Sequence, residues 1–95
     1  MEESTRLIRN PDLVFRVVNE EGVIYNPRTQ RLHMLNATAL MAWHLWDGDH
    51  SLLDIVNAVI SEYEADPQGV MNDISLCAKE LCRHGLLSDS SHTGN

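Results

Sequence analysis

The hydrophobic pattern of the chain changes its period near residues 35 and 36. Before this point, apolar residues alternate with polar ones or form short runs rich in β-branched and aromatic side chains, which is typical of strands. After it, apolar residues recur every three or four positions, the spacing of helices that bury one face. The pattern therefore predicts strands in the first third of the chain and helices in the rest.

Three short strands are predicted before residue 36. They span residues 13–18, 23–25 and 31–35, and turn sequences at 19–22 and 26–30 separate them. Connections this short join antiparallel neighbours, so the three strands should form a meander. Its third strand should then lie at an edge of the sheet.

Three helices are predicted to follow, each after a residue suited to a helix start. Asn36 is placed to cap a helix over 37–46, and Ser51 to cap a second one. Asp54 stands three residues after Ser51, as in a capping box. The pair Asp66-Pro67 predicts the start of the third helix, because proline is tolerated at the first helical position.

The predicted ends of the helices complete the order of elements, and this order gives the fold class. Residues 47–49 are predicted to be a turn that stops the first helix, and the third helix should end near His84 because Gly85 suits the position after a helix. Strands followed by helices predict an α+β fold, in which a three-stranded antiparallel sheet is followed by a three-helix bundle.

A chain of 95 residues predicts one domain. We place it at residues 12–88. Residues 1–11 are polar and are predicted to be a flexible N-terminal arm, and residues 89–95 a disordered tail, because chain ends are ordered only where contacts hold them.

Charge argues against one class of partner. Residues 1–35 hold five arginines and five acids, whereas residues 36–95 hold nine acids against Lys79 and Arg83, a sum of −7. A helical half this acidic would repel a phosphate backbone, so no nucleic-acid partner is expected. No apolar run approaches a membrane span and no signal segment is visible, so we expect no membrane contact and a cytoplasmic location.

No pattern of chemistry-bearing residues indicates catalysis. The five histidines lack metal-ligand spacing, no serine or cysteine has a base at a readable distance, and no glycine-rich phosphate loop is present. Asp47-Gly48-Asp49-His50 resembles the start of a calcium loop, but position twelve would be Ala58 inside a helix. We therefore expect no enzymatic activity, no metal and no cofactor.

Two neighbouring features indicate binding instead. The open edge of the third strand offers unpaired N–H and C=O groups to an extended peptide, although its polar residues Arg31 and His33 could equally serve to prevent aggregation. The third helix carries more apolar residues than a narrow stripe, which can line a groove or pack in the core.

The order of motifs around residues 35–48 resembles that of a known family. Leu35-Asn36-Ala37-Thr38-Ala39, then Trp43, Trp46, Asp47 and Gly48, resemble the Leu-Asn-x-Thr-Ala, Trp and Asp-Gly signature of the PqqD-like family. Asp54-Ile55-Val56 and Tyr63 resemble its second helix, and His84-Gly85-Leu86-Leu87 resemble the end of its third. The resemblance covers about residues 12–88.

The resemblance implies a winged-helix-like domain that recognises precursor peptides of ribosomally made, post-translationally modified products. It implies a non-catalytic peptide chaperone that binds the leader segment as an added strand and presents it to a modifying enzyme, such as a radical S-adenosylmethionine maturase or a leader peptidase. Carried over by position, the peptide contacts would be Arg31, Leu32, His33, Met34 and Leu35 on the strand, with Met71, Asp73, Ile74, Cys77, Ala78 and Leu81 on the third helix.

Two other functions stay open from the residues alone. A winged-helix module could bind DNA through its third helix, and an open strand edge could simply pair two copies of the chain.

The biosynthetic pathway that such a peptide-binding domain would serve is also open. The segment around residues 23–28 differs from the longer one in members that serve pyrroloquinoline quinone synthesis, and lasso-peptide and other systems use similar domains.

Overall fold

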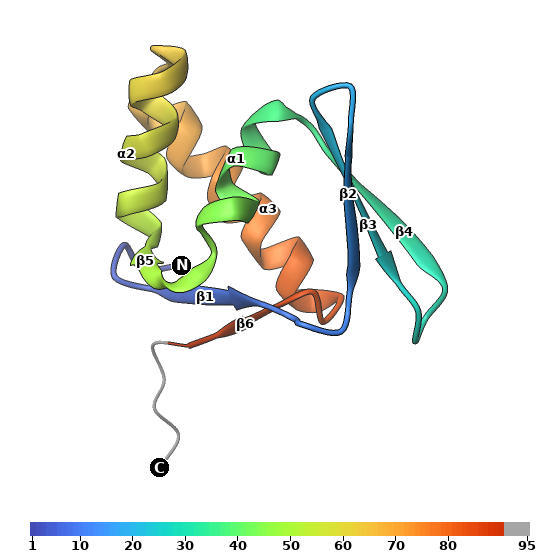
Figure 1. The fold of residues 1–95 in the computed structure, drawn as a ribbon. Coiled ribbons are helices and arrows are strands. Elements are labelled where there is room, and N and C mark those ends of the chain that lie inside the picture. Colours follow the sequence, from blue (N-terminus) through green and yellow to red (C-terminus); the bar gives the residue numbers. More distant parts are fainter. Residues whose placement is uncertain (91–95) are drawn as a thin grey trace.

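The predicted meander forms one antiparallel sheet in the computed structural model, which describes residues 1–90 (Figure 1). Strands β2 (Val14–Val18), β3 (Glu21–Asn26) and β4 (Arg31–Leu35) lie side by side in that order. In the register, Ile24 of the central strand is opposite both Phe15 and His33. The expectation that the third strand of the meander is an edge strand is confirmed.

A second three-stranded sheet was not predicted. It contains β1 (Arg6–Arg9), β5 (Asp47–Ser51) and β6 (Leu87–Asp89), with β1 in the centre. Residues 6–9 are therefore a strand and not a flexible arm, and residues 47–49 begin a strand where a turn was predicted. Of the predicted 89–95 tail, Asp89 ends β6, and residues 91–95 lie outside the described part of the chain.

The second sheet is assembled entirely from segments far apart in sequence. Its strands have three to five residues, too few to show a periodic pattern, and β5 reads Asp-Gly-Asp-His-Ser. Ladder pairing holds them, together with burial of Leu7 of β1 at 2% exposure. Gly48 has a φ of +90°, a backbone conformation that glycine adopts without steric cost.

The three predicted helices are confirmed together with their caps. They are α1 (Ala37–Leu45), α2 (Leu52–Tyr63) and α3 (Pro67–Arg83). Asn36 Oδ1 accepts the N–H of Ala39 at 2.9 Å, and the side chains of Ser51 and Asp54 each accept the other residue's backbone N–H. Each helix therefore starts where its sequence indicated.

The core lies between the helices and one face of the β2–β3–β4 sheet. Trp43 of α1 and Trp46, which follows the helix, are 3% and 1% exposed, and Ile24 brings the sheet into the same cluster. Leu86 and Leu87, after α3, are also buried. The two tryptophans are thus part of the scaffold.

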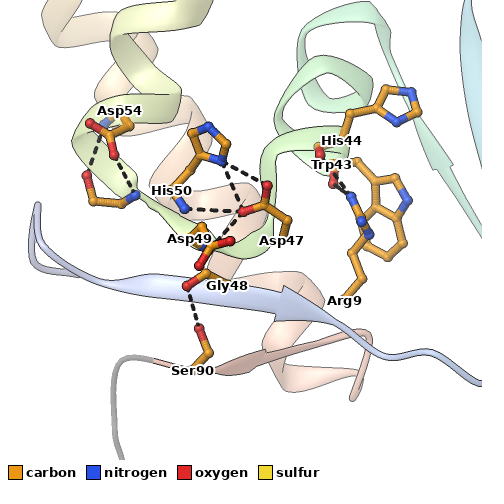
Figure 2. Close-up of polar contacts among 10 residues, drawn as sticks. Arg9, Trp43, His44, Asp47, Gly48, Asp49, His50, Asp54 and Ser90 are labelled. Atoms are coloured by element: carbon orange, nitrogen blue, oxygen red, sulfur yellow. Dashed lines mark hydrogen bonds and ion pairs between the residues drawn. The ribbon is translucent and has the colours of Figure 1, made fainter.

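Polar contacts attach the second sheet to the end of α1 (Figure 2). The Arg9 guanidinium donates from Nη1 to the carbonyl oxygens of Trp43 at 2.7 Å and His44 at 2.9 Å. These carbonyls belong to the last turn of the helix, where a cation is favoured by the helix dipole.

No helix within residues 1–90 is long and apolar enough to cross a membrane.

Candidate functional site

The free side of β4 is the first half of the candidate site. This strand pairs with β3 on one side, and within residues 1–90 no strand pairs with its other side. Backbone N–H and C=O groups of alternate residues therefore face outward, as in any antiparallel edge strand. An extended chain could complete this ladder.

The two faces of β4 differ in burial. Leu35 is 3% exposed and His33 is half-buried, and both lie on the face that packs toward the helices. Leu32 and Met34 point to the opposite face and are 63% and 64% exposed. The strand thus presents one supported face and one apolar face that lies open to solvent.

A flank of α3 forms the second half of the site. The rings of His33 on β4 and His84 at the end of α3 lie 5.2 Å apart between centroids. Asp73, Cys77 and Glu80 precede His84 at intervals of three and four residues, so they share its side of the helix. We call the cavity of about 460 Å³ between the two elements the β4–α3 groove; it is lined by Thr29, Arg31, His33, Arg83 and His84.

The helix residues carried over from the family form three groups on α3: two on the side of His84, three in the core, and Met71 on another side. Asp73 and Cys77 share the side of the helix that carries His84. Ile74, Ala78 and Leu81 are 1%, 0% and 5% exposed and form the core beneath the groove, so they support it and expose little surface to a partner.

Met71 is not brought together with β4. It stands one helical turn before Ser75, whose Oγ donates to Met71 Sδ at 3.8 Å, and Cys82 continues the same side of the helix. This side is opposite to that of His84. The sequence could show that α3 is apolar on more than one side, but not which side lies next to β4.

Sequence reasoning missed His84 as a site residue. Its position in the last turn of a helix, four residues after Glu80, is explained by local helix electrostatics alone. Nε2 of His84 does lie 3.7 Å from Glu80 Oε2. Only the packing of β4 against the end of α3 places it beside His33.

The groove changes the acidity of its side chains. Burial lowers the pKa of His33, and the neighbouring His84 and Arg31 lower it further, whereas Glu80 acts in the opposite direction. Burial also raises the pKa of the Cys77 thiol, which leaves it a weak nucleophile at neutral pH.

A second pair of titratable groups lies on β5, in a different part of the fold (Figure 2). His50 Nδ1 is 3.0 Å from both carboxylate oxygens of Asp47. This hydrogen bond lowers the pKa of Asp47 to about 2 and raises that of His50. No set of three metal-ligating side chains exists in residues 1–90, and within the same residues no hydroxyl or thiol is bonded to His50.

These environments predict opposite titrations for two histidines. His50 should lose its proton above pH 6.5, because Asp47 favours the imidazolium, and His33 should do so below pH 6.5, because burial disfavours it. The imidazole signals in ¹H–¹³C NMR spectra would be followed from pH 4.5 to 9. In an Asp47→Asn variant, the midpoint of His50 should fall while that of His33 stays unchanged. Equal midpoints in the parent protein would show that at least one of the two environments has been assigned wrongly.

Comparison with known proteins agrees with this architecture. The model of the family described as coenzyme PQQ synthesis protein D (PqqD) matches residues 21–87, which is more than two thirds of the chain. The chain belongs to the PqqD family. The matched residues run from β3 to the start of β6, so they contain both halves of the β4–α3 groove.

A solved structure of similar fold accompanies the family match. It is described as TbiB1 in complex with the TbiA(beta) leader peptide, with a TM-score of 0.75 and 23% sequence identity over 85% of this chain and 94% of that chain. At this identity, the likeness shows that the two chains share a fold. Comparison with curated proteins gives no match.

Proposed function

We propose that this PqqD-family protein binds the leader segment of a ribosomally synthesised precursor peptide as a fourth strand of its β2–β3–β4 sheet. The observation that carries the proposal is the open edge of β4 beside the flank of α3 that holds His84. Support comes from the family and from the shared fold of TbiB1, whose structure contains a leader peptide.

The geometry suits an extended ligand. Main-chain hydrogen bonds to β4 supply affinity that does not depend on sequence, and alternate side chains of the added strand supply specificity. Side chains on one face of that strand would enter the β4–α3 groove, next to His33. Those on the other face would extend the exposed apolar surface of Leu32 and Met34.

The helix contributes contact and support at different positions. We assign contact to Asp73 and Cys77, on the side of α3 that carries His84. We assign support to Ile74, Ala78 and Leu81, which are buried under it. Met71 is left out of the contact surface because it lies on the opposite flank.

The protein would act as a non-catalytic peptide chaperone in the cytoplasm. Its task would be to hold the leader so that a separate enzyme, such as a radical S-adenosylmethionine maturase or a leader peptidase, can modify or cleave the precursor. An added strand leaves the far ends of the peptide free, which is what presentation to a second protein requires.

The direct test is an NMR titration of the ¹⁵N-labelled chain with the leader peptide encoded by a neighbouring precursor gene. We expect amide shifts along residues 31–35 and at Cys77, Glu80 and His84, because these line the added strand. Residues 14–18 of β2, at the other open edge, serve as the internal control. Absence of shifts at β4 with peptide at millimolar concentration would contradict the proposal.

The same edge could pair two copies of the chain, and this alternative has a separate test. Sedimentation velocity at several protein concentrations should show a monomer that becomes a one-to-one complex with the leader. A concentration-dependent dimer whose dissociation is unaffected by the leader would favour self-association. DNA binding is not supported, since residues 36–95 hold nine acids against two basic residues.

A further inference from the structure

Positive charge gathers at one end of the β4–α3 groove. Three of the chain's seven lysines and arginines and two of its five histidines line this cavity and an adjoining one of about 490 Å³. They are Arg28, Arg31, Arg83, His33 and His84. This concentration is unexpected in a chain whose net charge is −7.

Two acids partly balance the cluster. Glu80 Oε2 lies 2.6 Å from Arg83 Nη2 and also 3.7 Å from His84 Nε2, and Asp12 lines the adjoining cavity. Three arginines against these two carboxylates leave a local charge of +1 when the imidazoles are neutral. Each imidazole that is protonated adds one more positive charge.

Arg31 and Arg28 are the two arginines of the cluster whose guanidinium groups have no partner in the described part of the chain, since neither group makes a hydrogen bond or an ion pair there. Arg31 lies on β4 itself, at the end of the open edge, and its side chain lines the groove together with His33. A guanidinium in this position presents a pair of donors that matches the geometry of a carboxylate.

From this juxtaposition we infer that the end of the β4–α3 groove is a specificity subsite for an acidic side chain, aspartate or glutamate, of the bound peptide strand. The inference rests on the proposed function, because it assumes that a peptide lies along β4. Beyond that function, the inference names the type of peptide residue that the groove selects and the side chains that select it. Arg31 would contact the carboxylate, with His33 and His84 beside it.

The imidazole of His33 makes the subsite depend on pH. A bound carboxylate favours the protonated form of His33, so binding takes up a proton and affinity rises as the pH falls. Burial, His84 and Arg31 disfavour that protonation and Glu80 favours it. A peptide glutamate stays largely ionised down to about pH 5.5, because its ordinary pKa is about 4.3.

The experiment selects binders from a library of random twelve-residue peptides displayed on phage, with the full chain as target. Selected peptides should carry aspartate or glutamate at one fixed position. The strongest would then be synthesised with that glutamate and with glutamine in its place. On the parent protein, glutamate→glutamine should weaken binding about tenfold, the effect expected of one charge-assisted contact.

The Arg31→Gln variant of the protein, tested with the same two peptides, completes a double-mutant cycle. Its affinity should be nearly the same for the two peptides, whereas Arg16→Gln, a matched change of an exposed arginine on β2, should keep the tenfold difference. Between pH 8 and pH 5.5 the glutamate peptide should bind progressively tighter to the parent protein and the glutamine peptide should not. In a His33→Gln variant, this pH dependence should be lost.

The outcomes distinguish failure of the acidic subsite from failure of the proposed strand addition. Peptides that shift the amides of residues 31–35 but show no acidic position, or bind equally with glutamate and glutamine, would overturn the subsite and leave strand addition intact. If an acidic position appears but persists unchanged in Arg31→Gln, the subsite lies elsewhere. If no selected peptide perturbs β4, the proposed function itself fails.

Discussion

Replacement of Trp43 by alanine should destabilise the fold by about 3–5 kcal/mol, the usual cost of removing a buried aromatic side chain. Trp43 is 3% exposed, and its ring lies 5.8 Å from that of Phe15 on β2, so it joins α1 to the sheet. For a domain of this size, the change should lower Tm by at least about 12 °C. Thermal melts followed by circular dichroism would measure it.

Binding to the leader peptide should also be lost in this variant. Without Trp43 the β2–β3–β4 sheet is no longer packed firmly on α1, so the β4–α3 groove loses its shape. Val18→Ala on β2, where the side chain is 51% exposed, is the stability control and should change the free energy of unfolding by less than about 0.5 kcal/mol. Arg31→Gln should show the reverse pattern, with a parent-like melt and weakened binding to acidic peptides. A parent-like melt for Trp43→Ala would mean that scaffold and site have been assigned to the wrong residues.

Alkylation of Cys77 should slow about tenfold when the leader peptide is bound, whereas alkylation of Cys82 should not change. The two cysteines are both half-buried and lie on opposite flanks of α3, so they form a matched pair. Burial raises the pKa of each thiol, and Asp89 adds to the effect at Cys82. The reaction with iodoacetamide is therefore best followed at about pH 8.5.

The size of this effect follows from occupancy. With free peptide at about nine times Kd, about one tenth of the protein is unoccupied, and only this fraction exposes Cys77. The rates would be measured by mass spectrometry on Cys82→Ser and Cys77→Ser variants, each of which retains one thiol. Equal protection of both cysteines would indicate that the peptide stiffens the whole helix, and no protection of Cys77 would remove α3 from the site.

The parts of this fold that local sequence determines were predicted correctly. Strands β2 to β4 have alternating or β-branched sequences and short turns, and the helices begin at Asn36, Ser51 and Asp66, whose side chains all accept backbone N–H groups of the first turn. These are interactions between residues close together in the chain. A sequence pattern is sufficient to reveal them.

The second sheet could not be predicted in this way. Its strands join the two ends of the described chain to the segment between α1 and α2, with Leu7 opposite Asp89 and Arg6 opposite Ser51. None of the three segments is long enough to carry a periodic signal, and the polar sequence of β5 resembles a turn. Their structure depends on pairing between residues at least 39 positions apart, as for Ile8 and Asp47, which local preference does not encode.

For the site, the sequence alone determined that an open strand edge and a partly apolar helix exist. Only the tertiary structure decided which flank of that helix meets the strand. It places His84 beside β4, with Asp73 and Cys77 on the same side of the helix and Met71 on the opposite side, and it buries Ile74, Ala78 and Leu81 in the core. The physical reason is that the core residues set the rotation of α3 about its axis. A helix with apolar residues on more than one side can be packed in several rotations, and the choice among them is made by contacts between distant elements.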